Sequence, residues 1–355
     1  MSWSKSRSGT DVVAPGRVVS TEQTLAWSRE LAEPALRTAV GTLPVSMRRI
    51  AGYHLGWWDR HGTHVPSGGS GKALRPTLVL LSSAAVGGTP RDAVPAAVAV
   101  ELVHNFSLLH DDVMDGDLTR RHRPTAWSVF GIGSAILAGD ALLTLALDVL
   151  AASSHPAAGA AMRTLSAAVQ DLVEGQCTDM DFEQRSTVDI LECENMVAGK
   201  TAALIGASCA LGAMFGQASQ DRVGHLRAFG EQLGLAFQHV DDLLGIWGRP
   251  ETTGKPVFSD LRNRKKSLPV VAALASDSPA GRELAGLYAR TAPLTDDELP
   301  HVADLVERAG GREWSRSQAD DLMARAVARL DELGQANPVA AELTDMARRL
   351  TRRDH

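Results

Sequence analysis

The sequence predicts an all-helical protein, and three observations support this. Apolar residues recur at helical spacing through most of the 355-residue chain. Aromatic residues make up only 5% of the composition, and no convincing run of strands is found. The Gly- and Pro-rich breaks between helical segments are short. We therefore expect one large helical domain over residues 21–355, after a mobile N-terminal tail over residues 1–20.

The expected helices follow from the spacing of their apolar residues. They cover residues 22–39, 45–58, 73–85, 94–113, 133–151, 157–183, 188–211 and 221–246, followed by shorter helices and then 315–333 and 339–350. Residues 135–150 and 202–214 are apolar on nearly all sides, which predicts central positions in a bundle.

Composition excludes several classes of protein. The net charge of −6 disfavours nucleic-acid binding. Three cysteines without a C-x-x-C pair indicate free thiols and neither a disulfide framework nor a zinc site. The N-terminal segment lacks the apolar core of a signal peptide, and no later stretch is expected to span a membrane, so we expect a cytoplasmic protein.

Two acidic clusters each end an apolar helix. In the first, Asp111-Asp112-Val-Met-Asp115, the first and last carboxylates lie one turn apart on one face and repel each other. A divalent cation removes that repulsion, and carboxylate oxygens suit Mg²⁺. The second cluster is Asp241-Asp242, with Gln238 within one turn. A solvated helix end would explain either cluster alone, but two clusters facing each other would form a multi-metal site for pyrophosphate.

Four basic segments accompany these acids. They contain Lys72 and Arg75; Arg120-Arg121-His122-Arg123; Lys200-Thr201; and Lys255 with Arg262-Asn-Arg-Lys-Lys266. Each could be an ordinary surface patch, and the first could be a capped helix start. Beside carboxylate pairs, in a chain of net negative charge, phosphate binding is the better hypothesis.

The ordered set of motifs resembles the trans-isoprenyl diphosphate synthases, the polyprenyl synthetase family that includes farnesyl and geranylgeranyl diphosphate synthases. The resemblance runs from about Trp27 to the C-terminus. The motifs are Glu101-Leu-Val-His-Asn-Phe-Ser-Leu-Leu-His-Asp-Asp-Val-Met-Asp115, Leu118-Thr-Arg-Arg-His-Arg-Pro-Thr125, Gly139-Asp140, Glu174-Gly-Gln176, Gly199-Lys-Thr201, Phe237-Gln-His-Val-Asp-Asp242, Gly254-Lys-Pro256 and Ser259-Asp-Leu-Arg-Asn-Arg-Lys-Lys-Ser-Leu-Pro269.

The resemblance implies antiparallel helices around a deep central cavity, a homodimer, and Mg²⁺ as cofactor. It implies that Asp111 and Asp115 hold Mg²⁺ on the allylic diphosphate from one side and Asp241 from the other, with Asp112 and Asp242 orienting these ligands. The residues implied for the allylic substrate are Arg120, Lys200, Thr201, Gln238, Lys255 and Lys265. Those implied for isopentenyl diphosphate are Lys72, Arg75, His104 and Arg121.

One position departs from the family pattern. The second motif usually reads D-D-x-x-D, but here it is Asp241-Asp-Leu-Leu-Gly245. The missing carboxylate leaves open how many metal ions that side holds and how tightly. Because Asp241 is retained, we expect activity with a weaker dependence on Mg²⁺.

The resemblance also bears on product length. Phe106 is bulky and Ser107 small, one turn before the first aspartates, where the family forms its pocket floor. This pair looks like the type that forms geranylgeranyl diphosphate (C20), although Phe106 could be ordinary core. The alternatives are a farnesyl diphosphate (C15) synthase, a class I terpene cyclase, and a non-catalytic partner subunit of another synthase.

Overall fold

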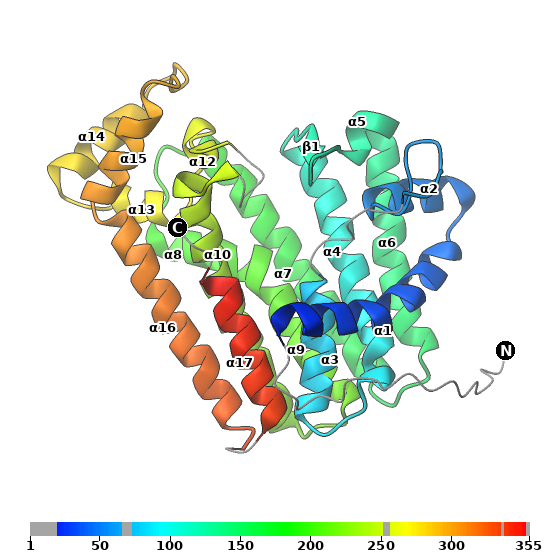
Figure 1. Ribbon diagram of the computed structural model, residues 1–355. Helices are drawn as coiled ribbons and strands as arrows, with labels where there is room; N and C mark the ends of the chain where they lie inside the picture. The colour runs from blue at the N-terminus through cyan, green and yellow to red at the C-terminus, as the bar shows by residue number, and fades with distance from the viewer. Residues whose placement is uncertain (1–19, 66–72, 251–255, 335–336, 353–355) are drawn as a thin grey trace.

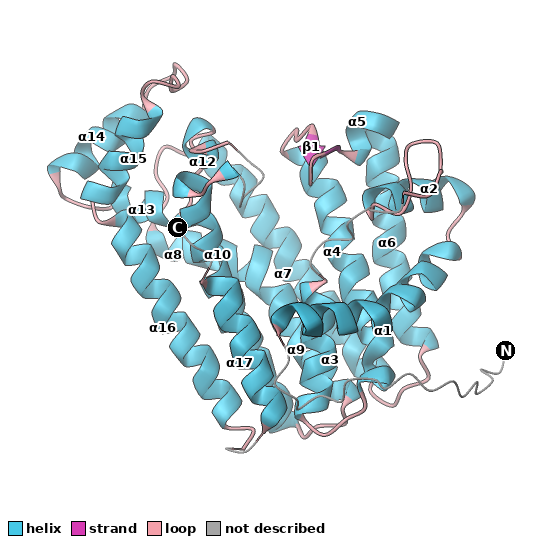
Figure 2. Cartoon of the chain, in the orientation of Figure 1, coloured by secondary structure: helices cyan, strands magenta, loops and turns pink. Residues whose placement is uncertain are grey.

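A computed structural model describes residues 20–65, 73–250, 256–334 and 337–352 of the chain. Over these residues the chain is a bundle of helices, which confirms the all-helical prediction (Figures 1 and 2). The predicted mobile tail lies outside the described residues, apart from Ser20. The α-helices are α1 Thr21–Gly41, α2 Val45–His54, α3 Leu74–Ala85, α4 Val94–Met114, α5 Ala126–Phe130, α6 Ile132–Ala152, α7 Ala158–Gln184, α8 Ile190–Val197, α9 Ala203–Phe215, α10 Gln220–Trp247, α12 Ser259–Arg262, α13 Leu268–Leu274, α14 Pro279–Tyr288, α15 Leu299–Arg308, α16 Gly311–Asp331 and α17 Pro338–Thr351.

Local capping explains where several helices begin. At the start of α1 the Gln23 backbone N–H donates to the Ser20 hydroxyl, and the Ser20 N–H donates to the Gln23 side chain. Asp189 and Glu192 form the same reciprocal pair at the start of α8. Each pair satisfies backbone donors that the first helical turn leaves without partners.

The segment predicted as one helix over 188–211 is divided in the structure. A π-helical turn, η2 (Ala198–Ala202), joins α8 to α9, whereas a regular α-helix was expected. Every residue of α9 except Ala203 and Met214 is buried, so the prediction of a central helix is confirmed there. This helix packs against α3, α4, α7 and α10.

The prediction that α6 is equally central is wrong. Ile132, Ile136 and Leu137 are 55%, 38% and 58% exposed, so α6 turns an apolar face outward. Apolar composition reports only that a surface must be covered, and the covering partner need not belong to the same chain.

The prediction that no stretch is long and apolar enough to span a membrane is also wrong, judged by helix length and composition alone. Among the described residues, three helical segments are long and apolar enough to do so, 90–114, 132–152 and 190–215. The most apolar windows of the first and third are 72% buried within the protein, and that of the second is 39% buried.

A small hairpin is the one pair of strands within the described residues. Strands β1 (Thr119–Arg120) and β2 (Arg123–Pro124) pair antiparallel directly after α4, where no strand was expected. Arg121 and His122 at its tip both have positive φ, 52° and 61°, which matches the tight turns of two-residue hairpins. Arg123 anchors the hairpin by donating to the carbonyls of Tyr53 and Trp58. The hairpin therefore holds Arg120 and Arg121 beside the end of α4.

Candidate functional site

The two acidic clusters lie at the same end of the bundle. Asp111 and Asp112 are in the last turn of α4, and Asp241 and Asp242 are near the end of α10. Both helices end at the top of Figure 1, where β1 follows α4 and α12 follows α10.

Each cluster contains one buried and at least one accessible carboxylate. Asp112 is 1% exposed and accepts a 2.6 Å hydrogen bond from Arg120 Nε. Asp242 is 3% exposed and accepts from Gln238 Nε2 at 2.8 Å and from the Leu268 N–H at 2.9 Å. Asp111 is half-buried, whereas Asp115 and Asp241 are exposed. The accessible carboxylates are thus backed by buried ones that are held in place.

Negative charge at the first cluster is only partly compensated. Burial raises the pKa of Asp111 to about 6; Lys200 opposes this shift and Asp115 adds to it. The pKa of Asp115 is also raised, mainly by burial. One oxygen of Asp112, Oδ2, is buried without a hydrogen-bond partner among the described residues. A cation bound here would favour the charged forms of Asp111 and Asp115 and would compensate the buried Oδ2 of Asp112.

The positive charge of Lys265 offsets the negative charge of the second cluster. Burial raises the pKa of Asp242 to about 6, against the lowering effect of Lys265. Burial alone would lower the pKa of Lys265, but nearby carboxylates, led by Asp242 and including Asp241, outweigh it and raise the pKa. Lys265 also lowers the pKa of Asp115 in the first cluster. The two clusters therefore share a basic neighbour.

The π-helical turn places Lys200 and Thr201. A methyl group on Gly175 of α7 would lie 2.3 Å from the Lys200 backbone nitrogen, and one on Gly199 would lie 2.5 Å from the Asp171 carbonyl oxygen. Glycine at both positions lets α7 and η2 approach this closely. At this contact Lys200 Nζ lies 2.5 Å from Asp179 Oδ2.

Sequence reasoning missed Asp179. The signal was present, because Asp179 follows Gln176 by three residues and so lies on the same side of α7. Nothing in the sequence alone showed that this side would meet Lys200.

A chain of hydrogen bonds links η2 to the second cluster. The Thr201 hydroxyl donates to Gln238 Oε1 at 2.8 Å, and Gln238 Nε2 donates to Asp242. The structure thus brings together Thr201, Gln238 and Asp242, all three predicted as site residues.

Three of the groups predicted for isopentenyl diphosphate, Arg75, His104 and Arg121, lie close to one another. Arg75 and His104 are half-buried, and Arg121 is exposed. Burial lowers the pKa of Arg75 to about 10, and the buried Glu101 is the carboxylate that opposes the shift. Arg75 Nε has no hydrogen-bond partner among the described residues. Positive groups outnumber carboxylates there, as an anion site requires.

His54, at the end of α2, belongs to the same group and was missed. Burial lowers its pKa to about 3, and Arg121 and Arg120 add to this effect. Its Nε2 is buried without a partner among the described residues. The residues Lys72 and Lys255, also predicted for the substrates, lie outside the described residues.

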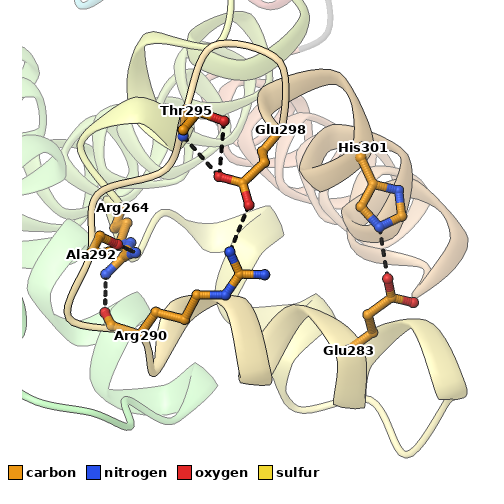
Figure 3. A network of polar contacts seen from close by, with 7 residues as sticks. All are labelled: Arg264, Glu283, Arg290, Ala292, Thr295, Glu298 and His301. Atoms are coloured by element: carbon orange, nitrogen blue, oxygen red, sulfur yellow. Dashed lines mark hydrogen bonds and ion pairs between the residues drawn. The ribbon is translucent and has the colours of Figure 1, made fainter.

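The basic run 262–266 is mostly structural, which corrects the expectation that it binds phosphate as a group. Arg262 pairs with Asp296, and Lys266 donates to the Phe182 carbonyl. Arg264 donates to the carbonyls of Arg290 and Ala292 (Figure 3). Only Lys265 of this run's basic residues acts on the site.

The donor atoms fit Mg²⁺ held jointly with a ligand. Among the described residues, no three His, Cys, Asp or Glu side chains lie close enough to hold a metal ion by themselves. The accessible carboxylates come in small sets, Asp111 with Asp115 on one side and Asp241 on the other. Mg²⁺ typically takes one or two carboxylates and completes its shell with water and phosphate oxygens, so the arrangement suits it.

Phe106 and Ser107 are both buried, one turn before Asp111. The Phe106 ring packs edge-on against His110, with 4.8 Å between ring centroids. The Ser107 hydroxyl donates to the His104 carbonyl at 2.9 Å.

Known proteins are similar to this one over most of the chain. The family Polyprenyl synthetase matches residues 60–306. The chain is 48% identical over 326 residues to the (2E,6E)-farnesyl diphosphate synthase of Mycobacterium tuberculosis (strain ATCC 25618 / H37Rv), covering 91% of this chain and 90% of that protein. It is 48% identical over 300 residues to the geranylgeranyl diphosphate synthase of the same strain, covering 84% and 85%. A solved polyprenyl synthetase from Streptomyces coelicolor A3(2) has a TM-score of 0.89 and 45% identity, covering 93% of this chain and 99% of that one.

Proposed function

The chain belongs to the polyprenyl synthetase family and is a chain-elongating trans-prenyltransferase; from this premise we propose how its residues act and which product it makes. We propose that it condenses isopentenyl diphosphate with allylic diphosphates between α4 and α10, mainly to geranylgeranyl diphosphate. The observation that carries the proposal is the pair of acidic clusters, each with accessible carboxylates, that share Lys265.

On this proposal, Asp111, Asp115 and Asp241 face the allylic diphosphate, while Asp112 and Asp242 fix their surroundings. Bound Mg²⁺ would neutralise charge as it develops on the leaving pyrophosphate. Arg120, Lys200 and Lys265 supply further positive charge to the same oxygens. Thr201 and Gln238 orient the diphosphate by hydrogen bonding.

The isopentenyl diphosphate would lie beside Arg75, His104 and Arg121. The C1–O bond of the allylic substrate breaks, and its electron pair leaves with pyrophosphate. The double bond of isopentenyl diphosphate then attacks C1, and the resulting cation loses a proton, with the released pyrophosphate as base. The buried apolar residues of α4 and α9 exclude water that would quench the cation.

The C20 product is proposed from Phe106. Its buried ring lies five residues before Asp111 on α4, and on this proposal it closes the far end of the pocket that holds the growing chain. The relatives do not decide the length, because one is named a farnesyl and another a geranylgeranyl diphosphate synthase.

We also propose that the enzyme is a homodimer that covers the outward face of α6. The only charged residues of α6 are Asp140 and Asp148, and its exposed positions include Ile132, Ile136 and Leu137. Acidic residues on this face disfavour an anionic membrane surface, so a second copy is the better occupant. A cytoplasmic location remains a prediction from the sequence.

One experiment tests the activity. Purified protein is incubated with isopentenyl diphosphate, Mg²⁺ and each of the C5, C10 and C15 allylic diphosphates, and the products are identified by mass. We expect linear C20 diphosphate as the main product. A cyclised hydrocarbon would favour a terpene cyclase, and a chain that binds another synthase without turnover would favour a partner subunit.

A further inference from the structure

His110, the residue directly before the first acidic cluster, has no part in the mechanism proposed above. It lies near the end of α4, along the contact between α4 and α6. Its side chain is 22% exposed, so most of the ring is enclosed by neighbouring atoms. Those neighbours decide where the ring lies.

Helix α6 fixes the orientation of the His110 ring. Its Nε2 lies 3.0 Å from the Ile136 carbonyl oxygen, which can only accept, so this nitrogen carries the proton and donates it. The same nitrogen lies 3.7 Å from Asp140 Oδ1. The ring is therefore tied to the backbone of α6 by a hydrogen bond as well as by packing.

Gly139 provides the space for this contact. A methyl group at position 139 would lie 2.3 Å from His110 Nε2 and 2.4 Å from His110 Cδ2. Both distances are far inside van der Waals contact, so a side chain there would push the ring away from the Ile136 carbonyl. Glycine at 139 lets the imidazole lie directly against the α6 backbone.

The His110 ring also contacts Phe106. The two residues are one helical turn apart on α4, and their ring centroids are 4.8 Å apart at an interplanar angle of 69°. This edge-to-face arrangement is one that aromatic rings favour. The position of the Phe106 ring is thus linked, through His110, to the backbone of α6.

We propose that His110 is a positioning residue that sets product length through Phe106. Helix α6 holds the His110 ring by the Ile136 carbonyl and the space at Gly139, and the His110 ring holds Phe106 where it closes the pocket. The inference rests on the proposed function, because it needs Phe106 to end the pocket. It requires no contact between His110 and substrate.

The test uses the full-length protein with the C15 allylic diphosphate and excess isopentenyl diphosphate. The ratio of C25 to C20 products is measured by mass. His110→Ala removes the ring, and Gly139→Ala displaces the ring without changing residue 110. Gly224→Ala on α10 is the control for a glycine substitution in a helix, because a methyl group there meets no atom within 4 Å.

We expect His110→Ala and Gly139→Ala each to raise the C25 to C20 ratio by about fivefold, the factor that loss of one aromatic contact of ordinary strength would give. Gly224→Ala should match the wild type. The Mg²⁺ concentration for half-maximal turnover should not change, because every carboxylate is retained. An unchanged product ratio in both variants would overturn the inference. A higher Mg²⁺ requirement with an unchanged ratio would show that His110 acts on the adjacent Asp111 instead.

Two double variants test whether the effect passes through these contacts. Gly139→Ala should have no further effect in a His110→Ala background, because the added methyl group then meets no ring. His110→Ala should have no further effect in a Phe106→Ala background, because the ring that it positions is gone. Additive effects in either background would overturn the inference and leave the proposed function standing. If Phe106→Ala itself leaves the products unchanged, the assignment of Phe106 to the pocket fails, and the role of His110 fails with it.

Discussion

Lys200 reaches across from the π-helical turn to α7, where its Nζ lies 2.5 Å from Asp179 Oδ2. Both side chains are largely buried, at 23% and 20% exposure, so the pair restrains the lysine before substrate binds. We expect Asp179→Asn to lower kcat/KM for the allylic diphosphate by about tenfold, because the charge of Lys200 remains but its position is lost.

A double-mutant cycle checks this role. If Asp179 acts through Lys200, Asp179→Asn should cost little more in a Lys200→Ala background. Equal costs in the two backgrounds would show that Asp179 acts independently of the lysine.

Replacing the two aspartates of the second cluster should have different effects, one on turnover and the other on stability. Asp241→Ala removes an exposed carboxylate, so we expect stability to change by no more than about 0.5 kcal/mol, with turnover largely lost at limiting Mg²⁺. Asp242→Ala leaves the Gln238 amide and the Leu268 N–H without their acceptor, which should cost about 1–3 kcal/mol of folding free energy. Urea unfolding and Mg²⁺ titration of activity measure the two effects. Near-normal turnover of Asp241→Ala at limiting Mg²⁺ would contradict its assignment as a metal ligand.

Helix positions and the identity of the acidic residues could be predicted from the sequence, because both are local. The predicted boundaries of α4 and α10 agree with the structure within one residue, since apolar spacing records which face is buried. The hairpin could not be predicted, because it depends on Arg123 reaching the carbonyls of Tyr53 and Trp58, 70 and 65 residues earlier.

Contacts between helices account for the other omissions. Asp179 gains its role only because Gly175 and Gly199 let two helical segments meet. The outward face of α6 was misplaced because its composition equals that of a buried helix.

Phe106 should control product length if it closes the pocket. Phe106→Ala is expected to shift the main product from C20 to longer chains, since the 106 side chain would no longer block the fifth isoprenyl unit. The buried ring contributes to the core, so the variant should lose about 3 kcal/mol of stability. Phe106→Leu, which keeps most of the volume, serves as the milder comparison. The measurement is the mass profile of the products of each variant. An unchanged profile in both variants would exclude Phe106 from the pocket.

His54 should make the protein less stable in mild acid. Its folded-state pKa is about 3, below the usual 6.5, so the unfolded chain binds more protons between these values. Stability is therefore complete above pH 6.5 and is lost as the pH falls toward 3. At pH 5 the loss attributable to His54 is up to roughly 2 kcal/mol. Urea unfolding at pH 7 and pH 5 should show a smaller acid loss in His54→Gln than in the wild type, with the exposed His61→Gln as control. An equal loss in all three proteins would contradict the prediction.

The outward face of α6 predicts how the dimer can be broken. Leu137 is 58% exposed in the single chain, and a homodimer through α6 would bury it in both copies. Leu137→Glu would place an unpaired charge there twice, which costs several kcal/mol, and Asp140 nearby adds repulsion. Leu191→Glu is the matched control, because Leu191 is 65% exposed but lies on α8. Analytical ultracentrifugation should give a dimer for the wild type and for Leu191→Glu, and a monomer for Leu137→Glu. A dimer that survives Leu137→Glu would show that the copies meet through another surface, because no two-fold contact over this face could bury both glutamates without partners.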